Sequence, residues 1–96
     1  MSSGNASSLT IDVAGVTTRD ALHQLLAEAF EFPAYYGRNW DAFDECIRDS
    51  ARSGQVTISG LESLRAELPR EAALFEQCML GFAAEDSRRC VIFSAT

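Results

Sequence analysis

The stretch from Phe32 to Ile47 reads FPAYYGRNWDAFDECI. It joins a turn rich in proline, tyrosine and glycine to the start of an acidic helix. Pro33 ends the region before it, because proline lacks a backbone N–H and has a fixed φ. Asn39 is a suitable N-cap, since its side-chain oxygen can accept a backbone N–H of the first helical turn. Gly37 allows a sharp turn into that cap. We therefore expect an aromatic loop followed by a helix that begins at Trp40.

The expected helix has an apolar face and a charged face. At 100° per residue, Trp40, Phe43 and Ile47 fall in one narrow sector, which predicts the core side. The opposite side carries the charged residues Asp41, Asp44, Glu45 and Arg48. Like charges at these spacings cost roughly a few tenths of a kcal/mol per pair, and the positive end of the helix offsets part of that cost. The acids are therefore either an ordinary solvated face or a binding face for a basic partner.

The two tyrosines before the helix favour the second interpretation. Tyr35 and Tyr36 lie in a turn between a proline and a glycine. Tyrosines held in this way are rigid, amphipathic surfaces of the kind that anchor interfaces. We expect one of the two to fill the core and the other to be exposed.

Composition limits the class of partner. The chain has 96 residues, a hydrophobic content of 47% and a charged content of 23%, which is typical of one folded domain. The net charge of −6 argues against nucleic acid or an anionic membrane and favours a basic protein. Residues 1–8 are expected to form a flexible tail and residues 9–96 a single domain. The start of the chain lacks the pattern of a secretory signal, and there is no apolar run long enough to span a membrane, so we expect a cytoplasmic location.

The remaining chain alternates strands and helices. Strands are expected at 9–13, 56–59 and 89–94, and helices at 17 or 18 to 30, 40–51, 61–68 and 69–84. Strands separated by helical crossovers predict an α/β fold in which a three-stranded parallel sheet packs with helices. The last strand is nearly all apolar after Arg89, which predicts burial on both of its faces.

Residues able to perform catalysis are few. The three cysteines, Cys46, Cys78 and Cys90, are widely spaced, which favours buried, reduced thiols over a disulfide framework or a zinc site. His23 is the single histidine and is expected at the surface or boundary of its helix. Motifs for nucleophilic, phosphate-binding or zinc chemistry are missing, so we expect no enzyme activity, cofactor or metal. A Mg²⁺ or Mn²⁺ site on the acidic helix face is the enzymatic alternative.

The same stretch resembles the signature of the barstar family, which comprises intracellular inhibitors of a secreted ribonuclease. The pattern P-x-Y-Y-G-x-N-x-D-A, with a cysteine five residues after the aspartate, matches at every position here, ending at Cys46. The likeness spans most of residues 9–94 and is sharpest over 32–47. It implies a three-stranded parallel α/β domain whose tyrosine loop and acidic helix plug the active site of the nuclease. The carboxylates would stand where RNA phosphates bind.

The resemblance also assigns roles by position. Tyr35 matches the interface tyrosine and Asp41 an interface aspartate. Glu45 stands where the prototype has its dominant aspartate, and its longer side chain loses more rotamer freedom on binding. Asp44 replaces a tryptophan. These two departures imply a different nuclease, of the small, basic, guanyl-specific kind. For a further acid on the late helix, Glu85 is a candidate, with Glu76 as the alternative.

The sequence thus predicts a monomeric ribonuclease inhibitor that gives its producer immunity to its own toxic nuclease. The expected partner-binding residues are Tyr35, Tyr36, Arg38, Asn39, Trp40, Asp41, Asp44, Glu45, Arg48 and Glu85. The first alternative is a module of the same fold that binds a basic protein other than a ribonuclease. The second is a domain whose acidic face is only solvated.

Overall fold

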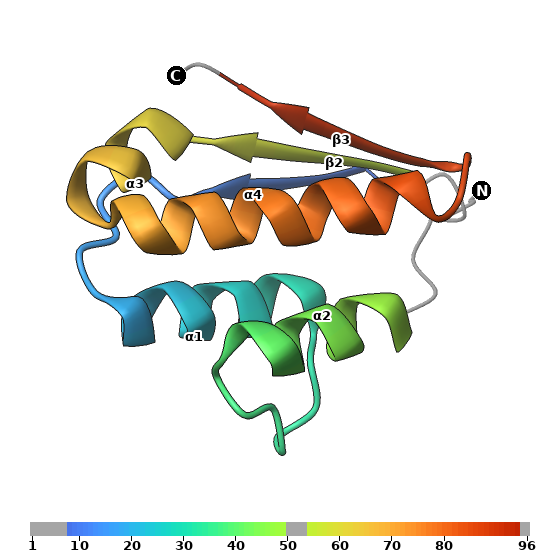
Figure 1. The fold of residues 1–96 in the computed structure, drawn as a ribbon, viewed down its shortest axis with the longest axis horizontal. Coiled ribbons are helices and arrows are strands. Elements are labelled where there is room, and N and C mark those ends of the chain that lie inside the picture. Colours follow the sequence, from blue (N-terminus) through green and yellow to red (C-terminus); the bar gives the residue numbers. More distant parts are fainter. Residues whose placement is uncertain (1–7, 50–53, 95–96) are drawn as a thin grey trace.

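The computed structural model describes residues 8–49 and 54–94. Its elements, in chain order, are β1 (Ser8–Asp12), α1 (Arg19–Phe30), α2 (Trp40–Asp49), β2 (Gly54–Ser59), α3 (Leu61–Glu67), α4 (Pro69–Ala84) and β3 (Arg89–Phe93) (Figure 1). The predicted order is confirmed, with boundaries shifted by one or two residues. The expected tail at 1–8 lies outside the described residues except for Ser8, which begins β1. The predicted end of the acidic helix, at 50–51, also lies outside them.

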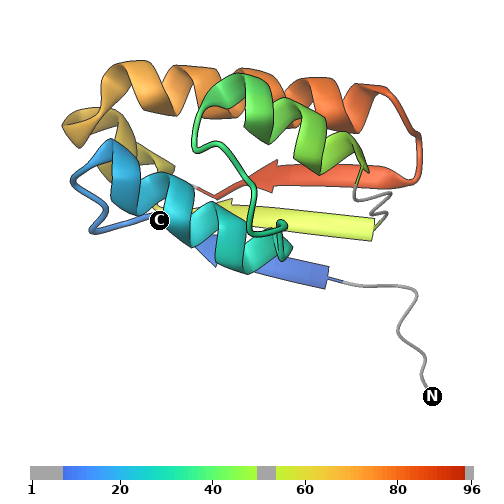
Figure 2. The ribbon, with the colours of Figure 1, turned by 90° about the horizontal axis from the view of Figure 1, so that it is seen from below.

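The sheet has the strand order β1-β2-β3, and both pairings are parallel. Ile11 of β1 is paired with Ile58 of β2, which is paired in turn with Phe93 of β3. Crossovers between parallel strands are almost always right-handed, and strands that follow chain order then have both crossovers on the same face. Figures 1 and 2 show this arrangement, with the helices gathered on one side of the sheet. The predicted α/β class with a three-stranded parallel sheet is confirmed.

The other face of the sheet is open, which contradicts the expectation for the last strand. Ile11, Val56 and Ile58 point toward the helices and are buried. On β3, Cys90 and Ile92 alternate with inward residues and are exposed. Burial on both faces requires a strand order that reverses, so that successive crossovers cover opposite faces. No helix of the described chain covers this face, so the prediction was wrong.

The cysteines follow the same division. All three are free thiols, as expected. Cys46 and Cys78 are partly buried, and burial raises the pKa of the Cys78 thiol. Cys90 is exposed on the open face of the sheet, so the expectation of burial was wrong for it.

The core lies between the sheet and helices α1, α2 and α4. Its largest fully buried side chains on these helices are Leu22, Leu26, Phe43, Ile47, Phe75, Met79 and Phe82. Thr18 begins α1, because its hydroxyl oxygen accepts the Ala21 N–H at 3.1 Å. Gly60, with φ 79°, joins β2 to α3 where a Cβ would lie 2.5 Å from the Ala14 nitrogen. Among the described helices, none is long and apolar enough to cross a membrane.

Candidate protein-binding site

The loop between α1 and α2, residues 31–39, extends away from the sheet beside both helices (Figures 1 and 2). Its two tyrosines have opposite environments. Tyr36 is buried, whereas the Tyr35 side chain is 84% exposed. The expectation that one tyrosine fills the core and one is exposed is confirmed. Tyr35 therefore presents a large amphipathic ring to any partner that approaches this end of the molecule.

His23 lies beneath the loop and is fully buried, so the expectation of a surface or boundary position was wrong. Its Nδ1 lies 2.6 Å from the Tyr36 hydroxyl, and its ring centroid is 4.5 Å from that of Trp40. Burial and the nearby Arg19 guanidinium lower the pKa of His23. Burial likewise raises the pKa of the Tyr36 hydroxyl. The rings of Tyr36 and Trp40 pack against His23 on α1. These contacts between segments distant in the chain bury His23, which the helix pattern alone would leave at the boundary.

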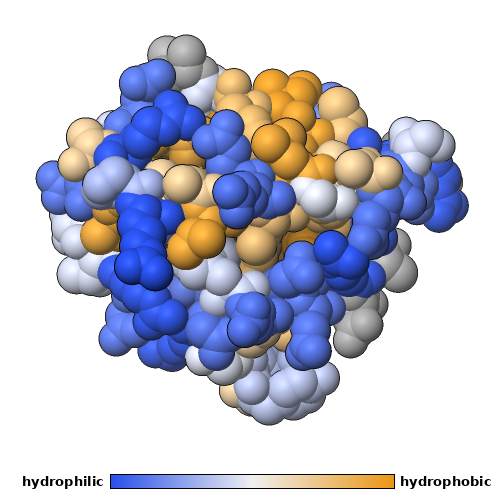
Figure 3. All heavy atoms as spheres, viewed as in Figure 1, coloured by the Kyte–Doolittle hydropathy of each residue, from blue (hydrophilic) through white to orange (hydrophobic). Residues whose placement is uncertain are grey.

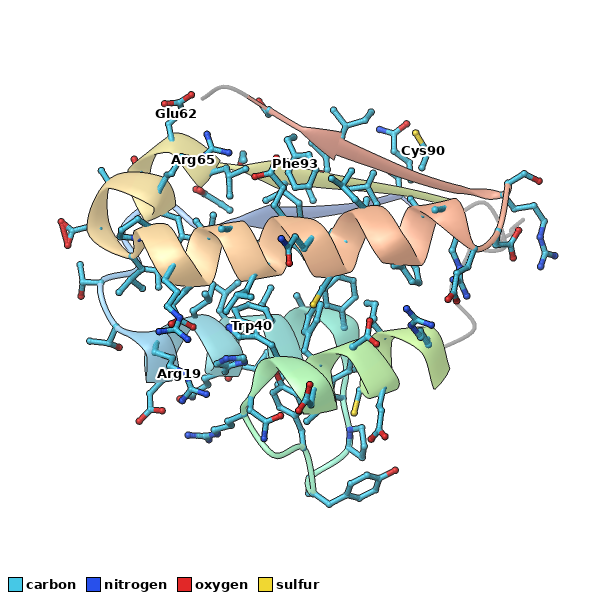
Figure 4. All side chains as sticks on the ribbon, in the orientation of Figure 1. Arg19, Trp40, Glu62, Arg65, Cys90 and Phe93 are labelled. Atoms are coloured by element: carbon cyan, nitrogen blue, oxygen red, sulfur yellow. The ribbon has the colours of Figure 1, made fainter. Side chains whose placement is uncertain are left out.

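Trp40 connects the start of α2 to α4. Its indole N–H donates to Glu71 Oε1 at 2.8 Å, and Arg19 Nε lies 3.6 Å from the same oxygen. Figure 4 shows Trp40 between α4 and the lower helices, and Arg19 at the start of α1. Sequence reasoning predicted Trp40 but missed Glu71 and His23 as its supports. A partly buried indole N–H usually finds a hydrogen-bond acceptor, but this tendency alone does not identify the carboxylate of Glu71, 31 residues away, as that acceptor.

The turn into α2 differs in one detail from the prediction. Asn39 Oδ1 accepts the Ala42 N–H at 2.8 Å, so the predicted N-cap is confirmed. The left-handed residue is Arg38, with φ 55°, whereas Gly37 has no positive φ. A Cβ at Gly37 would lie 3.3 Å from the Asn39 side chain, so the glycine instead makes room for the cap.

The charged face of α2 divides into two parts. Asp41 and Glu45 are exposed, and neither belongs to an ion pair within residues 8–49 and 54–94. Asp44 Oδ1, in contrast, lies 3.2 Å from Arg48 Nε. Arg48 also pairs with Glu85 at the end of α4. The guanidinium therefore bridges two carboxylates and two helices. Figure 3 views the whole molecule in the orientation of Figure 1. Hydrophilic side chains cover much of its lower half, where α1 and α2 lie.

The structure also separates the two candidate acids of α4. Glu85 is joined to α2 through Arg48. Glu76 pairs at 2.9 Å with Arg65 of α3, which Figure 4 places well away from α2. Glu85 therefore lies nearer to α2 than Glu76 does, and it remains the better candidate for a further partner-binding acid. The part of the chain that the structure describes has no group of three potential metal ligands, and the alternative metal site on α2 gains no support.

Two comparisons with known proteins bear on these features. A search of curated proteins finds no match to this chain. The family model for Barstar (barnase inhibitor) matches residues 6–95, which include the tyrosine loop, the acidic helix and all three strands. Because this match covers nearly the whole sequence, the chain belongs to the barstar family.

Proposed function

We propose that the protein inhibits a small, basic, secreted ribonuclease by covering its active site with Tyr35 and the exposed acids of α2. The observation that carries the proposal is an 84% exposed tyrosine beside a helix whose Asp41 and Glu45 carboxylates are exposed and belong to none of the ion pairs of the described residues, in a chain of the barnase-inhibitor family. An exposed aromatic ring beside free carboxylates suits a cationic cleft better than a neutral one.

The mechanism of inhibition is electrostatic mimicry. A ribonuclease holds RNA phosphates with cationic side chains, and carboxylates at similar positions can satisfy the same donors. Asp41 and Glu45 are one helical turn apart, on one side of α2, so both carboxylates can face one cleft. The net charge of −6 would also steer the two proteins together, and this steering weakens with salt.

Arg48 and the acids that it bridges have a secondary place in this proposal. Asp44 and Glu85 share one guanidinium, so they present less charge to a partner than their number suggests. Asn39 and Trp40 support the site through the helix cap and the hydrogen bond to Glu71. We further propose that the protein acts as a monomer in the cytoplasm of the producing cell, where it blocks the nuclease before export.

Inhibition assays against a panel of small, basic, guanyl-specific ribonucleases, at low and high salt, test the proposal. We expect stoichiometric inhibition that weakens as salt increases. A variant with both Asp41→Ala and Glu45→Ala should lose it. The matched control is Glu62→Ala, which removes a carboxylate from α3, at the opposite side of the molecule from the loop in Figure 4.

Failure to inhibit any ribonuclease of the panel would contradict the proposal. The function would then move to the alternative, a barstar-like module that binds a basic protein of another class. Inhibition that Glu62→Ala removes as well as the double variant would place the binding surface elsewhere.

A further inference from the structure

A pocket of about 400 Å³ opens between the C-terminal half of α1 and the tyrosine loop. Its volume falls in the range of sites that bind small ligands or inserted side chains. Its lining includes Glu28, Glu31, Phe32, Pro33, Tyr36 and Arg38. The pocket therefore lies beside the proposed interface, because the loop that lines it also presents Tyr35.

The walls of the pocket combine apolar surface with unpaired charge. Phe32 and Tyr36 are in contact, with ring centroids 4.9 Å apart. Glu28 and Glu31 on the helix side, and Arg38 on the loop side, take part in none of the ion pairs formed by the described residues. Two carboxylates and one guanidinium leave a net charge of −1. Aromatic faces beside carboxylates suit a cation, which gains from both.

The two ends of the tyrosine loop, Glu31 and Arg38, both have left-handed backbone conformations and both line this pocket. Glu31 has φ 57° and Arg38 has φ 55°, and in the described ranges they are the only non-glycine residues with positive φ. Glycine would adopt this conformation without steric cost. Both positions instead carry a long charged side chain, and both side chains line the pocket. At Glu31 this conformation ends α1, because the Glu31 backbone N–H donates to the carbonyls of Ala27 and Glu28. The helix end therefore fixes the position from which the Glu31 side chain reaches the pocket.

We propose that this pocket receives an arginine or lysine side chain from the protein that binds Tyr35 and Asp41; the inference rests on the function proposed above. The aliphatic part of the inserted side chain packs against Phe32 and Pro33. Its charged end reaches the carboxylates of Glu28 and Glu31. The interface thus extends from α2 across the loop onto α1, and the partner carries a cation beyond its catalytic cleft.

Substitution of the two acids tests the pocket on whichever ribonuclease the panel identifies. The variant Glu28→Gln with Glu31→Gln keeps size and hydrogen bonding and removes only charge. We expect its Kd to rise about tenfold at physiological salt. The matched control, Glu62→Gln with Glu67→Gln, makes the same charge change on exposed positions of α3 and should change Kd less than threefold, about the scale of long-range steering.

The effect of Arg38 on the occupant is measured with a small ligand, because Arg38 is itself among the expected partner-binding residues. If the pocket holds a cation, Arg38→Gln should bind N-acetylarginine amide as tightly as the unchanged protein or more tightly. Weaker binding of this ligand to Arg38→Gln would show that the guanidinium does not oppose the occupant, and the proposal would be wrong. An acid double variant that behaves like its α3 control also overturns it.

A second measurement does not depend on any ribonuclease. Amide chemical shifts of the free protein are followed by NMR during titration with N-acetylarginine amide, with N-acetylcitrulline amide as the neutral, nearly isosteric control. We expect saturable shifts around Ala27 and Phe32 with the arginine compound alone. Such shifts in a protein that inhibits no ribonuclease would uphold the pocket while the proposed function fails. Equal shifts with both compounds would overturn the pocket, even in an effective inhibitor.

Glu31→Gly separates binding from structure. Glycine relieves the left-handed conformation, so we expect Tm to stay the same or rise by about 2–5 °C. The arginine-dependent shifts should be lost, because one carboxylate is gone. A variant that keeps these shifts unchanged would show that the Glu31 side chain has no part in binding.

Discussion

The two ends of helix α2 are attached to the rest of the protein in different ways. At its start, Trp40 packs against the His23 ring and donates a hydrogen bond to the Glu71 carboxylate of α4. At its end, Arg48 is held on the surface by two carboxylates, Asp44 and Glu85. The first attachment uses no acid of α2. The second uses one acid of α2 and one of α4.

The difference shows that the number of acids on a helix does not measure the charge offered to a partner. The charged face of α2 carries the three carboxylates of Asp41, Asp44 and Glu45. Among the ion pairs of the described residues, only Asp44 takes part, and Asp41 and Glu45 do not. The attachment through Trp40 leaves the Asp41 and Glu45 side chains exposed. The surface attachment gives the other end a carboxylate–guanidinium–carboxylate arrangement with a charge near −1.

The largest expected effect comes from the free acids. Asp41→Ala should weaken binding to an inhibited ribonuclease by about 2–5 kcal/mol, mainly through faster dissociation, which is the usual cost of removing one partner of a buried charge pair at an interface. Asp44→Ala should cost less than about 1 kcal/mol, because Arg48 already offsets its charge. Dissociation rates measured for both variants check the comparison. An equal or larger effect of Asp44→Ala would show that the two ends do not differ.

The second-largest effect is expected at the hydrogen bond between Trp40 and Glu71, and it should be on stability. Glu71→Ala leaves the Trp40 N–H without its acceptor, so we expect the free energy of unfolding to fall by about 1–3 kcal/mol. Urea denaturation followed by tryptophan fluorescence measures it, since Trp40 is the single tryptophan. Glu62→Ala, an exposed acid on α3, is the control and should change stability by less than about 0.5 kcal/mol.

Acid should weaken the same attachment through His23. Its pKa is lowered from 6.5 in the folded protein by burial and then by Arg19. His23 therefore binds a proton more readily in the unfolded chain than in the folded protein. Its contribution to stability is fully present above pH 6.5 and is lost as the pH falls below that value. The slope cannot exceed about 1.4 kcal/mol per pH unit for one proton. Unfolding measured between pH 7.5 and 5 should show this loss. His23→Gln should flatten the curve, and an unchanged slope in that variant would assign the loss to other groups.

The smallest effect is expected at the surface attachment. Arg48→Gln should reduce stability by less than about 1 kcal/mol, because both ion pairs are partly exposed. It also frees Asp44 and Glu85 and makes the net charge more negative by one. We expect association with a basic ribonuclease to become about two- to fivefold faster at low salt, and this gain to vanish at high salt. Slower association would mean that Arg48 itself contacts the partner.

Local patterns in the sequence predicted most of the fold and the loop. The Asn39 cap, the Trp40–Phe43–Ile47 core face and the contrast between the two tyrosines depend on residues close in the chain, and the structure bears them out. The parallel order of three strands followed from alternating elements. The role of the site residues in binding stays a prediction.

What the sequence could not predict depends on contacts between distant segments. His23 is buried because the loop folds back over it, and Glu85 reaches Arg48 only because α4 packs on α2. The open face of β3 follows from the position of that strand in the sheet, since an apolar run alone does not say where the helices lie. Gly37 was expected to allow the turn into the cap, but the residue with a left-handed conformation is Arg38.

The register of the sheet has a consequence for how the protein becomes active after synthesis. Ser8 pairs with Gln55, so the tyrosine loop and α2, the proposed binding segment, lie inside the crossover that joins β1 to β2. Closing so long a connection is slow, since chain entropy is lost before the strands gain from pairing. When the tyrosine loop and α2 leave the ribosome, β2 and the residues of α4 that pack on α2 have not yet emerged from it. The order of translation therefore sets a delay between synthesis of the loop and α2 and completion of the fold that holds them in place.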